Sequence, residues 1–280
     1  MDDQPAVPRY PLWDGIYDFA FWPTNVKTFV GTFLCLLLLS FCACGLYTVA
    51  MFLAGLPQQT ALLEYYGMGV MVAARLTAGF VVLSFFLTIY PCACFMRIVE
   101  STAAGLDYVQ WNQGVWIELV KDMFFLVWIA VCSIAVPGAF LAFLRFSVPI
   151  SVDLWWIILS AGFLTLFPIF LLSTMLANQP WALLSVRVIN RLIEEPATAL
   201  ALYLHALAFG VPLAVLVYWM FSEPLFALAP LAGLYGAAYW LSYARLLGRV
   251  GWLVTEERVG ARRRGRESTR RTVKGQEELA

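Results

Sequence analysis

Charged residues are scarce in this chain: they make up 13% of its 280 residues, whereas hydrophobic residues make up 62%. Soluble domains carry about a quarter charged residues, and a fold of this size keeps too much surface to hide so much apolar material from water. A water-soluble globular protein is therefore excluded. The composition indicates a protein whose surface faces lipid.

The sequence also lacks a signal-peptide pattern. It begins with the acidic run Met-Asp-Asp, and its first apolar run is far longer than the core of a signal peptide. We expect that first run to be retained as a membrane span. All six cysteines lie within apolar runs, so the disulfide framework of a secreted domain is not expected.

Long apolar runs are abundant. A bilayer core of about 30 Å requires about 20 apolar residues in a helix, and helix is expected because backbone groups in lipid must be hydrogen-bonded within the segment. The intervals between charges predict about six spans, with five or seven as alternatives. They are Thr28–Leu53, Leu76–Met96, Met123–Leu144, Leu154–Leu176, Ala197–Phe221 and Leu225–Ala244. The predicted fold is all-α, a polytopic transmembrane helical bundle.

Lysine and arginine set the expected orientation. With the N-terminus inside, only Arg75 and Arg145 fall on the outer side, and every other basic residue is cytoplasmic. The positive-inside rule therefore favours cytoplasmic N- and C-termini. We divide the chain into a cytoplasmic N-terminal segment with an interfacial helix (1–27), a six-helix transmembrane domain (28–254) and a basic, disordered cytoplasmic tail (255–280).

Amphipathic stretches occupy the cytoplasmic breaks between spans. Each carries a tryptophan at its start, where an indole ring suits the headgroup zone, and we interpret them as interfacial helices. Their apolar stripes are Leu12, Ile16, Phe19 and Ala20 after Trp13; Val115, Trp116, Leu119, Val120 and Met123; and Trp181, Leu184, Val188 and Leu192. An interfacial helix followed by a span out and a span back thus occurs three times (12–96, 113–176 and 181–247). We interpret this as three hairpins in a weak repeat.

Two cytoplasmic stretches carry short patterns. The first comprises Arg97, Ala103-Ala104-Gly105, Trp111, Trp116, Glu118-Leu119 and Lys121-Asp122; the second comprises Phe167-Pro168, Leu171-Leu172-Ser173, Asn178, Leu184-Ser185, Arg187, Pro196 and Tyr203. They resemble two loops of uncharacterised bacterial multi-pass membrane proteins that are grouped as a domain of unknown function. The acidic run of that family is here only Gly105-Leu106-Asp107. The resemblance implies a fold and a bacterial membrane, but no activity.

The predicted spans hold one ionisable candidate site. His205 is the only histidine and lies within the fifth predicted span, where it is either a proton-relay or ligand site or a hydrogen-bonding partner of a neighbouring helix. No carboxylate shares its span, which favours the packing role. A single histidine cannot build a metal site, and cysteines two apart on a helix, as at Cys42/Cys44 and Cys92/Cys94, point in nearly opposite directions. We therefore expect no metal and no cofactor.

The sixth predicted span contains closely spaced small residues: Ala232, Gly233, Gly236 and Ala237. Such pairs let helix backbones approach closely, either within one bundle or across a dimer. Packing within the bundle is the favoured interpretation.

Charged and aromatic candidates lie on the predicted cytoplasmic face. A candidate interaction surface comprises Arg97, Trp111, Trp116, Glu118, Asp122, Arg187 and Arg191. The basic tail is expected to contact anionic lipid headgroups of the inner leaflet, and an interleaved glutamate argues against specific nucleic-acid binding. The tail residues are Arg262, Arg263, Arg264, Arg266, Arg270 and Arg271.

Three classes of function stay open. The favoured one is a non-enzymatic scaffold or assembly partner at the inner leaflet of the bacterial cell membrane, with protein partners that the sequence does not identify. A transporter or permease subunit would need a polar cavity at mid-membrane near His205. A lipid-modifying enzyme would need Asp14, Glu118 and Asp122 to converge at the cytoplasmic surface, although no D-x-x-D or H-x-E motif joins them.

Overall fold

The computed structural model describes residues 16, 19, 23, 25–54, 63–106, 109, 116–145, 152–222 and 226–277; the side chains of 63–69, of 255–277 and of a few helix ends are outside this description. The described residues form helices and no strand, which confirms the all-α prediction. The helices are α1 (Val26–Ala54), α2 (Leu63–Ala103), α3 (Trp116–Arg145), α4 (Val152–Ala177), α5 (Val186–Glu194), α6 (Pro196–Ser222) and α7 (Ala229–Glu277), with the short 3-10 turn η3 (Phe226–Leu228) before α7.

Within the described part of the chain, five helices are long and apolar enough to cross a membrane, which fits an integral membrane protein. They are Val26–Met51, Val70–Ala103, Trp116–Leu144, Ile157–Ala177 and Pro196–Phe221. These match the first five predicted spans. The sixth predicted span, Leu225–Ala244, is helical from Phe226 onward but is not among the five.

Helix α7 differs from the other spans because it lies at the centre of the bundle, where it contacts α1, α2 and α6. Its side chains Ala237, Leu241 and Ala244 are buried. Residues 235–254 of α7 are covered by neighbouring helices, and a covered helix does not need a uniformly apolar surface, since its neighbours can satisfy its polar groups. This position accounts for the tyrosines, the tryptophan and Arg245 that lower the apolar character of α7.

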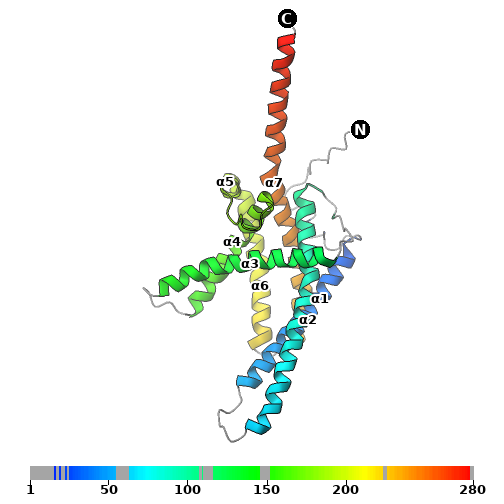
Figure 1. Cartoon of the computed structure of the whole chain (residues 1–280), viewed down its shortest axis with the longest axis vertical. Helices are drawn as coiled ribbons and strands as arrows, with labels where there is room; N and C mark the ends of the chain where they lie inside the picture. Colours follow the sequence, from blue (N-terminus) through cyan, green and yellow to red (C-terminus); the bar gives the residue numbers. More distant parts are fainter. Residues whose placement is uncertain are drawn as a thin grey trace.

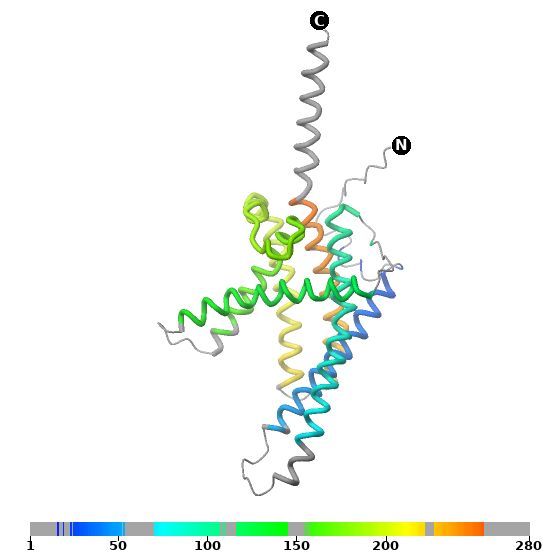
Figure 2. Tube along the Cα trace, in the orientation of Figure 1, coloured from blue at the N-terminus to red at the C-terminus, as the bar shows by residue number. Residues whose placement is uncertain are grey.

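The spans pair as the predicted hairpins, because α1 contacts α2, α3 contacts α4, and α6 contacts α7. Figure 1 shows α1, α2, α6 and α7 running lengthwise, whereas the α3–α4 hairpin extends across them, and Figure 2 traces the same course without the ribbons. The three hairpins are thus not arranged alike. This difference speaks against the predicted repeat.

Close contacts fix α7 against α1 and α2. A Cβ atom added at Gly233 would lie 3.1 Å from the backbone N and Cα of Leu37 on α1, so the two backbones are nearly touching. The Trp240 indole Nε1 donates a hydrogen bond to the carbonyl of Pro91 on α2, at 2.9 Å. The small residues of the sixth predicted span therefore serve packing within the bundle, as predicted.

The first predicted interfacial helix lies mostly outside the described residues, and the second is not found as such. Ile16 and Phe19 are buried in the hydrophobic core, and the Phe19 ring lies 4.4 Å from the guanidinium carbon of Arg245. Arg245, expected to flank a span, is itself only 1% exposed. The other residues of the first stripe, together with Trp13, lie outside the described residues. Trp116 begins α3, which continues unbroken to Arg145, so the second stripe is the start of a span.

The third predicted interfacial helix exists but is shorter and turned differently. Helix α5 begins at Val186, after Trp181 and Leu184. Val188 is fully buried and Leu192 packs against the core. These two residues were predicted to face the membrane, and they face protein instead. A helical period shows which residues share a face, but it does not show what covers that face.

Residues in the left-handed backbone conformation follow the ends of two helices. Gly105, at φ 78°, follows α2, and Asn178, at φ 52°, follows α4. After α2 the amide of Leu106 donates to the Ser101 carbonyl and that of Gly105 to the Thr102 carbonyl, both at 3.0 Å, which is the Schellman motif. After each cap the chain enters one of the two stretches that carry the short sequence patterns around Gly105 and Asn178.

Replacing Gly105 by alanine is expected to destabilise the protein by about 1–2 kcal/mol, because a Cβ is strained at this φ and would lie 3.0 Å from Trp252 Nε1. Gly79→Ala is the matched control, since a Cβ there meets nothing within 4 Å and alanine favours helix. Thermal unfolding in detergent measures both. Equal melting temperatures for the two variants would contradict the described cap.

Candidate functional site

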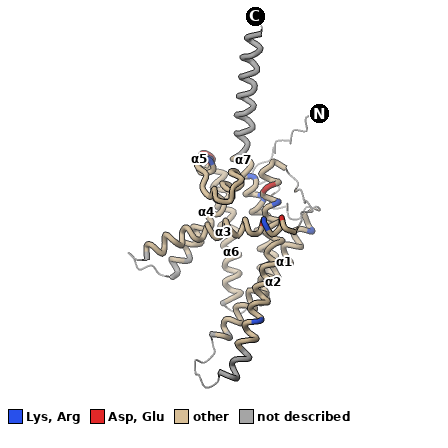
Figure 3. The backbone as a smooth tube through the Cα atoms, viewed as in Figure 1, with Lys and Arg blue, Asp and Glu red and all other residues tan. Residues whose placement is uncertain are grey.

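The described charged side chains gather in two places, where the end of α2 meets the start of α3 and on α5 beside α7 (Figure 3). Arg97 on α2 stands at the centre of the densest group. Its guanidinium donates a hydrogen bond to Glu118 Oε2 at 3.4 Å. Its Nη1 lies 3.8 Å from Glu100 Oε2, and its Nε lies 3.8 Å from Asp122 Oδ2. Three carboxylates from two helices thus share one arginine.

The sequence predicted Arg97, Glu118 and Asp122 as part of one surface, and the structure brings them together. It did not predict Glu100. The signal was available, because Glu100 is three residues after Arg97 on the same helix, and residues at that spacing are neighbours on a helix surface.

Exposure divides this group into an inner and an outer part. The side chains of Arg97 and Asp122 are mostly covered, whereas those of Glu118 and Glu100 are 54% and 47% exposed. Exposed ion pairs contribute only about 0–1 kcal/mol to folding, so stability alone does not explain three carboxylates around one arginine. The two outer carboxylates are available to groups outside the chain.

Aromatic contacts join the start of α3 to α2. Trp116, the first residue of α3, is exposed and stacks on Phe86 of α2, with ring centroids 6.3 Å apart. Phe85, also on α2, lies against Phe124 of α3 at 6.0 Å. The start of α3 is thereby fixed beside α2, with the exposed indole of Trp116 on the side of α3 that faces Phe86. Trp111, the other predicted aromatic of this surface, lies outside the described residues.

His205 lies in the packed interior of the bundle and is 2% exposed. Its Nε2 is 3.3 Å from the hydroxyl of Ser242 on α7. The ring stacks near Tyr239 and Tyr243 and lies 4.7 Å from Phe209. His205 therefore joins α6 to α7 through a hydrogen bond and aromatic contacts, as the packing interpretation predicts.

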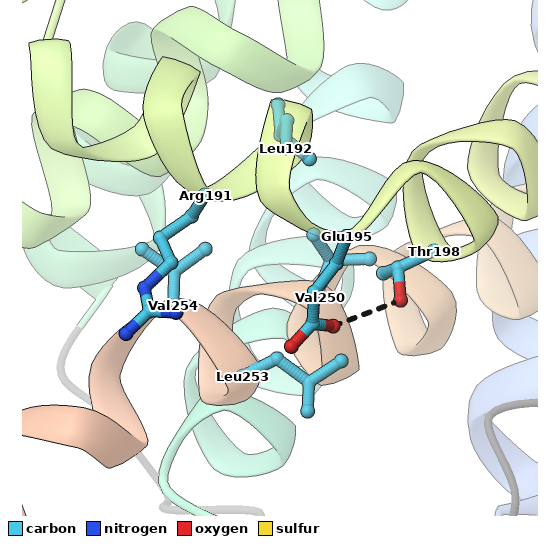
Figure 4. A pocket seen from close by; sticks show the side chains of 7 residues that line it. All are labelled: Arg191, Leu192, Glu195, Thr198, Val250, Leu253 and Val254. Atoms are coloured by element: carbon cyan, nitrogen blue, oxygen red, sulfur yellow. Dashed lines mark hydrogen bonds between the residues drawn. The ribbon is translucent and has the colours of Figure 1, made fainter.

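Arg191 lies at a small cavity between α5, the start of α6 and α7, shown in Figure 4. The cavity holds about 10 Å³, which is room for about one water molecule. Arg191 pairs with Glu194 at 2.9 Å, and the Thr198 hydroxyl donates to Glu195 Oε2 at 3.2 Å. Arg191 thus has an acidic partner, and the Glu195 carboxylate has a hydrogen-bond donor. The lining residues are Arg191, Leu192, Glu195, Thr198, Val250, Leu253 and Val254.

Arg187 is exposed on α5 and does not belong to the Arg97 group or to the lining of this cavity. The predicted surface therefore consists of two separate parts, one on α2 and α3 and one on α5. Asp14 lies outside the described residues. The tail arginines lie within the residue range of α7, but their side chains are not described. The predictions of lipid contact and of a disordered tail therefore stay predictions.

The described residues contain no group of three His, Cys, Asp or Glu side chains placed to hold a metal ion. The cysteines that the structure describes are free thiols, and Cys92 and Cys94 are buried on α2.

Comparison of the chain with protein-family models, with curated proteins and with solved structures finds no match. The resemblance of the two loops to a bacterial membrane-protein family stays a prediction.

We expect the aromatic shape of His205 to matter more than its ionisation. His205→Phe should keep the stacking and lose one hydrogen bond, at a cost of about 1 kcal/mol. His205→Ala should leave a cavity and cost about 3 kcal/mol. Thermal unfolding of the purified protein measures the difference. Equal losses in the two variants would contradict the packing role.

Proposed function

We propose that this chain is a non-enzymatic scaffold or assembly partner in the bacterial inner membrane, with both termini in the cytoplasm. The five apolar helices support the membrane location. The bias of lysine and arginine supports the orientation, and the gathering of charge at one end of the bundle (Figure 3) agrees with it. The resemblance of the two loops supports the bacterial origin.

The Arg97 group carries the proposal. Two helices hold Arg97, Glu118 and Asp122 in fixed positions, while Glu118 and Glu100 remain about half exposed. Trp116, two residues before Glu118 on α3, is also exposed. Half-exposed carboxylates held around an arginine suit a protein partner with basic groups, because complementary charge guides association. The exposed ring of Trp116, on another side of the start of α3, is of the kind enriched at interfaces. The tail arginines are proposed to hold the anionic lipids of the inner leaflet.

One observation favours a lipid-modifying enzyme as a second candidate. Of the three carboxylates that such an enzyme would need, Glu118 and Asp122 do converge, each within 3.8 Å of Arg97. Both are directed at the same guanidinium, so ion pairing accounts for their positions without catalysis. A transporter has less support, because His205 is closed in by Ser242 and by aromatic rings.

Reversing one exposed charge tests the scaffold proposal. Glu118→Lys is expected to abolish cross-linking of the full-length protein to partners in its native membrane, since lysine would repel a basic partner. Glu194→Lys on α5 is the matched control, because its side chain is exposed to a similar degree, 59% against 54%. Cross-linked partners are identified by mass spectrometry.

The orientation is read in the same experiment. A membrane-impermeant cross-linker is expected to capture the partner in inverted vesicles and not in spheroplasts. An identical set of partners for wild type, Glu118→Lys and Glu194→Lys would argue against the Arg97 surface. Capture in spheroplasts would argue against a cytoplasmic face.

A further inference from the structure

Helix α5 and the turn before it present three distinct faces. Successive helical residues are about 100° apart, so Val188 and Leu192 share one face. This face is turned to the protein, because Val188 is fully buried and Leu192 lines the cavity beside Val250 and Val254 of α7. The remaining two flanks of α5 point away from the bundle.

One outward flank is apolar and the other is polar. Val186 and Ile193, seven residues apart and hence on the same side, are 72% and 70% exposed. The turn before the helix adds Trp181 and Leu184, which are 76% and 63% exposed. The neighbouring flank carries Arg187, Asn190 and Glu194, all of them exposed.

Hydrogen bonds hold the backbone of this segment in place. The indole Nε1 of Trp128 on α3 donates to the Pro180 carbonyl at 3.1 Å, and the Trp128 and Trp181 rings meet edge to face at 5.0 Å. The Ser185 amide donates to the hydroxyl of the buried Ser173 at 3.0 Å. The exposed apolar side chains are therefore presented by an anchored segment.

The placement of α5 relates this apolar flank to the membrane. In Figure 1, α5 is seen nearly end-on while α6 runs lengthwise, so α5 lies across the end of α6. Helix α6 starts one residue after the end of α5. It carries an exposed apolar stripe of its own, which faces lipid if α6 spans the membrane. The stripe is Leu200, Leu204, Leu207 and Val211.

We propose that the segment from Trp181 to Ile193 is a docking surface for the phospholipid leaflet, lying at the level of the headgroups. Trp181, Leu184, Val186 and Ile193 enter the outer part of the acyl chains, as in amphipathic helices that lie in the interface plane. Arg187, on the polar flank, binds a lipid phosphate. The inference rests on the proposed membrane location and assigns its lipid contact to a named surface.

Charge supports the role of Arg187. Arg191 is paired with Glu194, and Glu195 accepts a hydrogen bond from Thr198. None of the salt bridges among the described residues includes Arg187. A guanidinium beside an apolar flank is well suited to the phosphate oxygens, and anionic lipids are expected to be preferred over zwitterionic ones.

Depth-dependent quenching tests the position of the segment. The full-length protein carries a fluorescent dansylalanine in place of Leu184, or in place of Val211 near the middle of α6, and is reconstituted in phosphatidylcholine and phosphatidylglycerol vesicles. A nitroxide near the headgroup should quench the label at 184 more strongly than a nitroxide near the chain end, and the order should reverse at 211. Quenching at 211 without quenching at 184 overturns the inference alone. The absence of quenching at both positions overturns the membrane location and the inference together.

Lipid preference tests Arg187. Native mass spectrometry of protein released from equimolar vesicles gives the ratio of bound phosphatidylglycerol to phosphatidylcholine. Arg187→Gln is expected to lower this ratio by up to about five-fold, whereas Arg187→Lys, which keeps the charge, should retain most of it. An unchanged ratio in Arg187→Gln would remove Arg187 from the proposed surface.

Discussion

The close approach of α7 to α1 and α2 is the contact on which the rest of the structure depends. Gly233 allows the α7 backbone to reach Leu37, and Gly248 allows it to reach Thr102 and the Val99 carbonyl, where a Cβ would lie only 2.6 and 2.8 Å from its neighbours. Between these two points, Trp240 hydrogen-bonds to Pro91. Without a Cβ at these glycines, α7 can make dispersion contacts with its neighbours between Gly233 and Gly248.

This central position of α7 explains where polar side chains are found inside the bundle. Ser242 meets His205, and Arg245 is buried beneath the ring of Phe19, so the polar groups of α7 are matched by neighbours from α6 and from the N-terminal segment. Exposed charged groups gather around Arg97 and on α5, while Lys27 and Arg75 are exposed elsewhere on the described helices. The buried polar groups of α7 thus serve packing, whereas the proposed protein and lipid contacts involve exposed side chains.

Much of the architecture could be predicted because apolar runs of this length have few alternatives in water or in lipid. The five spans and the neighbourhood of Arg97, Glu118 and Asp122 follow from charge spacing and helical period. The orientation of α5 could not be predicted from the sequence. The helical period places Val188 and Leu192 on one face, but it cannot show whether protein or lipid covers that face. The burial of Arg245 and the crosswise α3–α4 hairpin depend on contacts between distant segments, which no local pattern encodes.

The stability of Gly248→Ala tests the central contact most directly. The added methyl group would overlap the Thr102 Cβ and the Val99 carbonyl, and backbone atoms cannot move aside as a flexible side chain can, so we predict a loss of about 2 kcal/mol or more. Thermal unfolding of the purified protein, with wild type measured alongside, gives this loss. A melting temperature equal to or above that of wild type would show that α7 does not pack against α2 in this way.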